Sequence, residues 1–289
     1  MVRSASGMRV IGILALFAVS AFAGVAPVSQ ARDLYNRTDY EAALKLLLQM
    51  ELKDGPVWEL IGRSYFMEGK FKQAGEAFQK AVAADPNHSD YHLWLGRAFG
   101  RRAETSSPFT APGLASRARR CFEKAVELNP RNGEAMNDLF EYYVQAPGFL
   151  GGGLDKAAAL AQRIQDLDPA EYHFAQAQLA EKRKEWGTAE QQLRRAVDLA
   201  PQQAGRVIDL AKFLARQGRH QESEAAFQKA AQIAPNNPRV LFERANTYIH
   251  AKRNLEQARL LLEQYLASPL TPNDPPREEA ERLLKQVGG

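Results

Sequence analysis

Apolar and small residues recur along this chain in one repeating order, and each copy of that order ends at a proline. The prolines are Pro86, Pro130, Pro169, Pro201 and Pro235. A small residue stands twelve positions before each proline, a large apolar residue stands eight positions before four of them, and alanine or isoleucine stands five positions before each. Two successive intervals are 32 and 34 residues long, and a period of this size indicates an array of structural repeats.

The unit at 55–88 predicts two helices that pack against each other. Its apolar positions are Trp58, Ile61, Gly62 and Tyr65 on the first helix, and Ala74, Phe78 and Ala81 on the second. These spacings put each set on one helix face. Gly62 and Ala74 allow the two backbones to approach closely, and the larger side chains fill the space around that contact. Pro86 ends the second helix because it has no N–H to continue the hydrogen bonding.

The order of residues in this unit resembles the tetratricopeptide repeat, which places Trp, Leu-Gly, Tyr, Ala, Phe, Ala and Pro in that order; Ile61 stands for the leucine. The resemblance implies an all-α fold, a right-handed α-solenoid of about seven helix-turn-helix units plus a C-terminal closing helix. The expected units lie near 32–54, 55–88, 89–132, 133–169, 170–203, 204–237 and 238–272, with the closing helix at 276–287.

Two units are longer than the others at the turn between their two helices. The extra residues lie at 105–113 and 146–153. Because consecutive units stack in one direction, equivalent turns lie side by side on one edge of the array. We therefore expect the two longer loops to be neighbours in space.

The first 31 residues lie outside the repeat pattern. Arg3 and Arg9 precede an apolar run from Val10 to Ala26, and the whole segment lacks acidic residues. This order is typical of a secretory signal peptide at 1–31, with cleavage after Ala23 or Ala31. A periplasmic or secreted protein is expected. The alternative is an uncleaved anchor in the inner membrane, with the repeats facing the periplasm.

Composition narrows the classes of partner. Without residues 1–31 the chain keeps 36 of its 38 basic residues and all 34 acidic ones, so it is close to neutral. Nucleic-acid binding, which needs a concentrated basic face, is not indicated. Cys121 is the only cysteine, which excludes an intramolecular disulfide. Its position beside Phe122 favours a buried structural thiol over a reactive one.

No arrangement of residues points to catalysis, so we expect a protein that is not an enzyme and has no cofactor. His88 and His92 are four residues apart, but no cysteine or third histidine follows at ligand spacing, and no metal site is expected. The three glycines at 151–153 lack the Lys-Ser/Thr of a phosphate loop. The surface of the array remains as the functional part.

The resemblance implies a binding groove on the concave side, lined by the first helix of each unit. The groove positions that it carries over are Glu59, Arg63, Met67, Leu93, Arg97, Arg101, Phe174, Gln178, Lys182, Ile208, Lys212, Arg216, Phe242 and Asn246. This mixture of apolar, basic and amide side chains suits an extended peptide or protein segment. The implied function is a protein–protein interaction scaffold outside the inner membrane, in an envelope assembly process, with a partner that the sequence does not identify.

A second predicted surface is basic and lies at the first of the longer loops. Its members are Arg102, Phe109, Arg117, Arg119, Arg120 and, from the second loop, Phe149. Arginine suits the geometry of carboxylates and phosphates. The alternative function is therefore the binding of a polyanion or an acidic partner, centred on residues 97–120. A solvated face with partial ion pairing is the other interpretation of the same arginines.

Overall fold

The computed structural model describes residues 18–288, which form fifteen α-helices, one short 3-10 helix and no strand. The helices of the first half are α1 (Ala18–Asn36), α2 (Tyr40–Gln49), α3 (Gly55–Met67), α4 (Phe71–Ala84), α5 (Ser89–Glu104), α6 (Ala111–Leu128) and α7 (Gly133–Gln145). Those of the second half are η1 (Gly148–Leu150), α8 (Leu154–Gln165), α9 (Pro169–Lys182), α10 (Trp186–Leu199), α11 (Ala204–Arg216), α12 (His220–Ile233), α13 (Pro238–His250), α14 (Leu255–Ala267) and α15 (Arg277–Val287).

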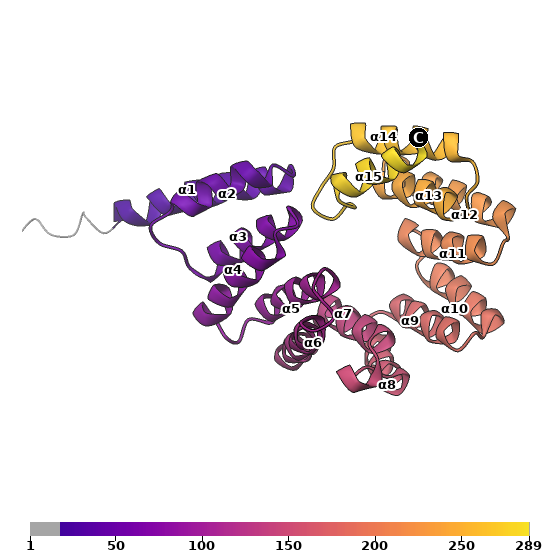
Figure 1. The fold of residues 1–289 in the computed structure, drawn as a ribbon, viewed down its shortest axis with the longest axis horizontal. Coiled ribbons are helices and arrows are strands. Elements are labelled where there is room, and N and C mark those ends of the chain that lie inside the picture. Colours follow the sequence, from indigo (N-terminus) through magenta and orange to yellow (C-terminus); the bar gives the residue numbers. More distant parts are fainter. Residues whose placement is uncertain (1–17, 289) are drawn as a thin grey trace, which may run out of the picture.

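The helices follow one another as antiparallel pairs, and each pair packs on the next (Figure 1). The first helices of the pairs, such as α5, α7, α9 and α11, lie on the inner side of the curve. The second helices, such as α6, α8, α10 and α12, lie on the outer side. This arrangement confirms the predicted solenoid of helix-turn-helix units, and α15 is its closing helix.

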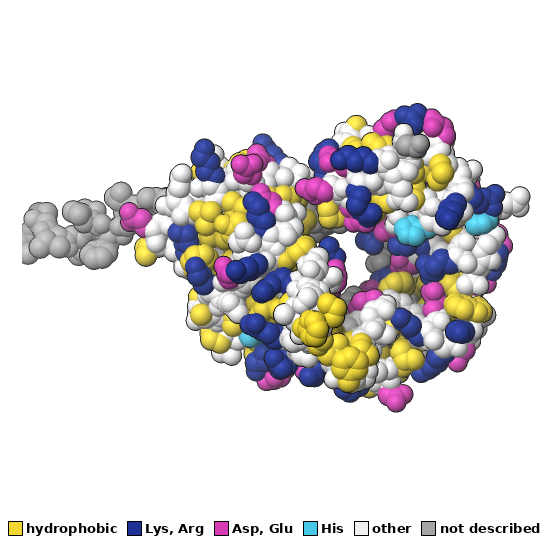
Figure 2. All heavy atoms as spheres, in the orientation of Figure 1, with side chains coloured by type: hydrophobic (Ala, Val, Ile, Leu, Met, Phe, Trp, Pro, Cys, Tyr) yellow, Lys and Arg dark blue, Asp and Glu magenta, His cyan; other side chains and the backbone are white. Residues whose placement is uncertain are grey.

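The array curves until its two ends approach each other around a central opening (Figures 1 and 2). A small cavity of about 90 Å³ lies where the ends meet. Tyr40 and Met67 line it from the first units, and Leu270 and Pro275 line it from the segment before α15. Burial raises the pKa of the Tyr40 hydroxyl above its usual range, as expected for a side chain enclosed by both ends.

The close approach of paired helices depends on glycine at the predicted position. A Cβ atom at Gly62 would lie 2.5 Å from Cε1 of Phe78, and one at Gly96 would lie 2.6 Å from Cε1 of Phe122. Phe78 and Ala74 are fully buried. The aromatic ring of the second helix therefore lies directly against the backbone of the first, as the sequence predicts.

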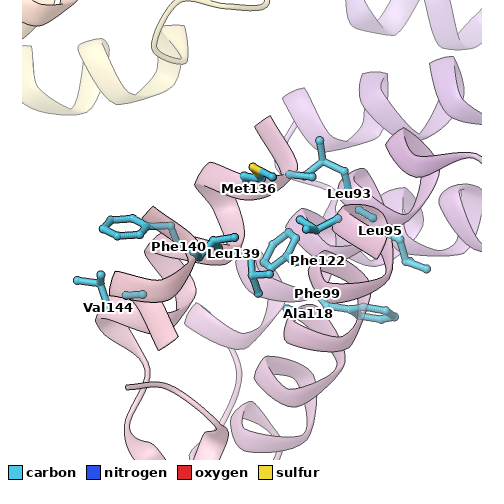
Figure 3. Close-up of a cluster of buried hydrophobic side chains, with 14 of the residues drawn as sticks. Leu93, Leu95, Phe99, Ala118, Phe122, Met136, Leu139, Phe140 and Val144 are labelled. Atoms are coloured by element: carbon cyan, nitrogen blue, oxygen red, sulfur yellow. The ribbon is translucent and has the colours of Figure 1, made fainter. Parts of the chain in front are cut away.

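The largest hydrophobic cluster crosses the boundaries between units, from α4 to α9. Figure 3 shows Phe99, Phe122 and Leu139, which come from α5, α6 and α7, gathered in this cluster. At the end of the array, Ala280 and Leu283 of α15 are buried against the last unit. Each unit is thus covered by the one that follows it, which is how a solenoid obtains a continuous core.

The predicted boundary at residue 31 falls inside α1. Residues 1–17 lie outside the described part of the chain, whereas Ala31 and Tyr35 are buried with side chains of α2 and α3. The signal peptide stays a prediction from the sequence. Within 18–288, no helix combines the length and the apolar character that a membrane span requires.

The two longer loops differ in construction. The first covers 105–110, which is shorter than the predicted 105–113, because residues 111–113 already form the first turn of α6. The second contains η1 and folds back tightly on itself. A Cβ atom at Gly152 would lie 1.8 Å from the backbone oxygen of Ala146, so only glycine fits there.

Candidate functional site: the concave groove

A large cavity of about 810 Å³ opens on the inner side of the array, between α7, α9 and α11. It is lined by Glu141, Gln145, Phe174, Gln178, Glu181, Lys182, Trp186, Leu193, Asp209, Lys212, Arg216 and Gln217. A second cavity of about 500 Å³ shares Lys212 and Arg216 with the first and continues to Asn246 and His250 of α13. We call the residues that line these two cavities the groove.

The helical period explains how the groove side chains come to one face. The predicted positions found in the lining are Phe174, Gln178, Lys182, Lys212, Arg216 and Asn246. Residues four apart on a helix lie on the same face, which aligns these members of α9 and of α11. The start of α9 is fixed because the Asp168 side chain accepts hydrogen bonds from the N–H groups of Ala170 and Glu171.

Most charged groups of the groove are paired across neighbouring first helices. The pairs are Lys182 with Gln145 at 2.7 Å, Arg216 with Glu181 at 2.8 Å and Lys212 with Glu243 at 2.8 Å. Each pair joins one unit to the next, so the groove wall is a ladder of lateral contacts. Lys212 and Arg216 are therefore neutralised by the array itself, whereas Lys182 is held by a neutral amide.

Asp209 differs from the other groove carboxylates, because Glu141 and Glu181 both accept hydrogen bonds. No hydrogen bond reaches its carboxylate from any residue in 18–288, and the nearest basic group is Nη1 of Arg206 at 3.6 Å. Arg206 is engaged instead by Glu171 of α9. Burial raises the pKa of Asp209 to about 6, against the opposing charges of Arg206 and Lys212. The carboxylate faces the groove with its hydrogen-bonding capacity unused.

Apolar area lies beside this carboxylate. Trp186, at the start of α10, lines the same cavity and is 44 % exposed. Phe174 is half-buried, with the Arg206 guanidinium 5.2 Å from its ring centroid. The sequence prediction missed both Asp209 and Trp186. Asp209 interrupts the apolar run 207–211, and an acidic residue in such a run could have marked it as a groove residue. No feature of the sequence marked Trp186 as one.

The sequence predicts three groove residues to be accessible that the structure shows to be buried. Leu93, Ile208 and Phe242 are 1 %, 1 % and 4 % exposed and belong to the hydrophobic clusters. Figure 3 shows Leu93 next to Met136 of the following first helix. The physical reason is that successive first helices pack on each other, which closes the space that these side chains would otherwise line.

The predicted groove positions of the early units form a different arrangement. The guanidiniums of Arg63 and Arg97 lie 4.4 and 4.7 Å from the ring centroid of Trp94. Arg97 also contacts Asp138 at 2.6 Å and is joined to Glu134 at 3.0 Å. Such stacked, paired arginines bind neighbouring units together. These positions stabilise the array, and none of them lines the two groove cavities.

The remaining early positions are also paired or enclosed. Glu59 forms an ion pair with Arg63 at 2.5 Å, and Arg101 forms one with Glu104 at 2.8 Å. Met67 lines the small cavity between the ends of the array. The part of the concave side that remains open is therefore the second half of the array.

The predicted basic surface divides into paired and unpaired arginines. Arg119 forms an ion pair with Glu123 at 2.7 Å, and Arg117 lies 4.0 Å from the ring centroid of Phe99. Arg102, Arg117 and Arg120 have no acidic partner among residues 18–288. Phe109 and Phe149, from the two longer loops, are almost fully exposed.

The remaining candidates for chemistry occupy structural positions. Burial raises the pKa of the Cys121 thiol to about 11, which makes it a poor nucleophile at neutral pH. His88 stacks on Tyr91 with 4.0 Å between ring centroids, and Nε2 of His92 lies 2.8 Å from the backbone oxygen of Pro86. Residues 18–288 contain no group of three potential metal ligands.

Known protein families match the chain at both ends of the array. One family model, described as a tetratricopeptide repeat, matches residues 28–89 and 59–102, and a second with the same description matches 214–275. The chain is a tetratricopeptide repeat protein. Repeats of this kind serve in general as protein–protein interaction scaffolds, and proteins are their usual class of partner.

Solved repeat proteins share the fold. A tetratricopeptide repeat protein from Parabacteroides merdae has a TM-score of 0.58 and 14 % identity, over 92 % of this chain and 98 % of that one. A thermophilic repeat protein of Thermus thermophilus has a TM-score of 0.54 and 22 % identity, over 66 % of this chain and 98 % of that one. A chain of the APC/C hetero-tetramer Cut9–Hcn1 has a TM-score of 0.51 and 18 % identity, over 91 % of this chain and 49 % of that one. These likenesses show the fold alone.

One curated relative matches part of the repeat protein. The general transcriptional corepressor trfA of Dictyostelium discoideum is 27 % identical over 118 residues. The match covers 39 % of this chain and 8 % of the corepressor, so the chain spans a small fraction of that protein's length.

Proposed function

We propose that this repeat protein is a non-enzymatic scaffold that binds an extended segment of a protein partner in the groove. The observation that carries the proposal is the Asp209 carboxylate, which lines the groove without a hydrogen-bond partner in the described chain. A partly buried carboxylate that lacks a hydrogen bond lowers the stability of the folded protein. A perturbed acid in a cleft is a candidate for ligand binding for this reason.

The chemistry of the groove defines the segment that would fit. A lysine or arginine side chain can form a charge-assisted hydrogen bond with Asp209. Phe174 and the exposed part of Trp186 offer apolar area beside it, and such aromatic anchors contribute strongly to binding. The proposed partner segment therefore carries a basic residue next to an apolar or aromatic one.

The test uses peptides selected from a random displayed library against the full chain. We expect selected peptides to share a basic residue beside an aromatic or aliphatic one, and to change the tryptophan emission of the parent chain but not that of a Trp186→Phe variant. Asp209→Asn should weaken their binding about tenfold, which corresponds to the loss of one charge-assisted hydrogen bond.

Asp198→Asn is the matched control, because Asp198 is an exposed acid on α10 that does not line the groove. It should leave peptide affinity unchanged. Selected peptides that bind equally well to the Asp209→Asn variant, or that leave Trp186 fluorescence unchanged, would contradict the proposal.

The compartment is a separate part of the proposal. The basic residues and apolar run of 1–31 support export, which would place the scaffold outside the inner membrane in an envelope assembly process. N-terminal sequencing of the chain recovered from a fractionated bacterial host tests this. A mature form from the periplasm that begins after Ala23 or Ala31 is expected, whereas an intact chain found only in the cytosol would contradict export.

A second candidate function is the binding of an anionic partner at the basic surface. Arg102, Arg117 and Arg120 support it, since none of them has an acidic partner among the described residues. Inorganic polyphosphate is a suitable soluble probe. Replacement of these three arginines by glutamine should remove salt-sensitive binding of the probe and leave peptide binding in the groove unchanged.

A further inference from the structure

Two phenylalanines protrude from the two longer loops. Phe109 is 96 % exposed and Phe149 is 83 % exposed. Exposed single apolar residues are common, but two almost fully exposed aromatic rings on adjacent insertions are not explained by the fold. We call Arg102, Phe109, Arg117, Arg120 and Phe149 the loop surface.

The two loops lie at the same helix. The first loop leads directly into α6, and the second lies against α6, because Gly151 approaches the Arg119 side chain so closely that a Cβ there would be 2.8 Å from Nε. Figure 2 shows two hydrophobic patches below the central opening, over the part of the array that holds α6 and η1.

The second loop is held in place by hydrogen bonds. The Tyr142 hydroxyl donates to the backbone oxygen of Leu150 at 2.9 Å, and Lys156 Nζ donates to that of Gly151 at 2.9 Å. These bonds fix η1, which carries Phe149. The ring is therefore presented by an ordered support, and its exposure is a stable property of the fold.

Basic residues lie on the helices that adjoin the two loops. Arg102 lies in the last turn of α5, and Arg117 and Arg120 belong to α6, between the two loops. Side chains of a helix tilt toward its N-terminus, which in α6 is the end that the first loop enters. Neither the segment 105–122 nor the segment 146–154 contains an acidic residue. The neighbouring Arg119 is neutralised by Glu123.

The charge of the loop surface extends along its edge of the array. Turns within units lie on this edge and carry seven basic residues, Arg37, Lys70, Arg183, Lys184, Arg219, Lys252 and Arg253, against three acidic ones, Asp39, Glu68 and Glu185. Turns between units lie on the opposite edge and carry six acidic residues, Glu51, Asp54, Asp85, Asp166, Asp168 and Asp274, against two basic ones, Lys53 and Arg131. Because paired helices are antiparallel, all turns within units lie on one edge and all turns between units lie on the other. The turn residues therefore have a net positive charge on one edge of the array and a net negative charge on the other.

We propose that the loop surface docks on a membrane that contains anionic lipids. Phe109 and Phe149 enter the interface between headgroups and acyl chains, and the unpaired arginines contact lipid phosphates. Two protruding rings fit a soft interface better than a rigid protein surface, which would need a pocket for each. The inference narrows the second candidate function to one kind of anionic partner and is independent of the groove.

The test is Phe109→Trp in the full chain, mixed with vesicles of phosphatidylcholine with or without phosphatidylglycerol. We expect the emission of the new tryptophan to shift to the blue, and brominated lipid to quench it, with anionic vesicles only. Leu52→Trp is the matched control, because Leu52 is 86 % exposed in the turn between α2 and α3, on the acidic edge. Its emission should not change.

Two further variants separate the contributions within the Phe109→Trp chain. Replacement of Arg102, Arg117 and Arg120 by glutamine should weaken vesicle binding about fivefold per arginine. Phe149→Ser should weaken it about tenfold. The N-terminal apolar segment is the same in every variant, so it cannot produce these differences.

The opposite results are equally informative. No blue shift with anionic vesicles, or equal shifts at positions 109 and 52, would overturn membrane docking. If polyphosphate still binds while the vesicle signal is missing, membrane docking is wrong and the second candidate function stands. If neither binds, both are wrong, and the groove proposal is unaffected.

Discussion

Arg206 and Asp209 lie one helical turn apart on α11, with 3.6 Å between Nη1 of the guanidinium and Oδ2 of the carboxylate. The other terminal nitrogen of the guanidinium, Nη2, forms its hydrogen bond with Glu171 of the preceding first helix. The lateral contact between units takes precedence over the contact within the helix. Asp209 is thereby left to the groove, partly buried and without a hydrogen-bond donor among residues 18–288.

Asp209→Asn should stabilise the protein at neutral pH. The folded-state pKa of about 6 lies above the unfolded value near 4, so the folded state binds more protons between these values. Stability from this group is therefore greatest below about pH 4, decreases as the pH rises to about 6, and is constant above. At pH 7 the variant should gain about 1–3 kcal/mol.

Urea unfolding of both proteins at pH 4, 5 and 7 measures this effect. The difference between variant and parent should grow with pH and then level off. A difference that is constant over this range would show that Asp209 does not titrate in the folded state near pH 6. The same variant should bind the selected peptides more weakly, so a gain in the free energy of unfolding is expected together with a loss of peptide affinity.

Gly62→Ala should destabilise the protein by about 1–3 kcal/mol, because the added methyl group would overlap the ring of Phe78. Phe78 is fully buried and has no space to move into. Thermal unfolding measures the loss. Gly100→Ala is the matched control, since a Cβ at this position within α5 would meet nothing within 4 Å. It should stabilise the protein by about 0.5–1 kcal/mol, because alanine favours the helix.

Arg97→Met should destabilise the protein by about 1–3 kcal/mol, since it leaves Asp138 partly buried without its partner. Burial raises the pKa of Asp138 even with Arg97 present, which shows how poorly solvated this carboxylate is. The double variant Arg97→Met/Asp138→Asn should lose less than the sum of the two single losses. Additive losses in chemical unfolding would show that the pair does not join the units energetically.

Cys121 should react slowly with thiol reagents in the folded protein. A thiol pKa of about 11 leaves roughly one thiolate in a thousand at pH 8, about a hundredfold fewer than for an ordinary thiol. Reaction with a chromogenic disulfide should accelerate to the rate of a free thiol in denaturant. Rapid reaction of the native protein would contradict the assignment of a structural role.

The construction within each unit could be predicted from the sequence, because it depends on short-range spacing. Gly62 and Phe78 lie in one unit, and their contact follows from the repeat order and the helical period. Phe174, Gln178 and Lys182 were likewise predicted as one face of a helix and line one cavity. The prediction of Leu93, Ile208 and Phe242 as accessible failed, since it depended on how one unit covers the next.

The sequence by itself determined the repeat, the pairing of helices and the positions of the two longer loops. Each follows from residues that are near one another in the chain. The tertiary structure decided which concave side chains stay open, that the two ends of the array meet, and that Arg206 forms its hydrogen bond with a neighbouring helix and leaves Asp209 without one. These features depend on the rotation between successive units, which accumulates around the array and is not contained in the pattern of any single unit.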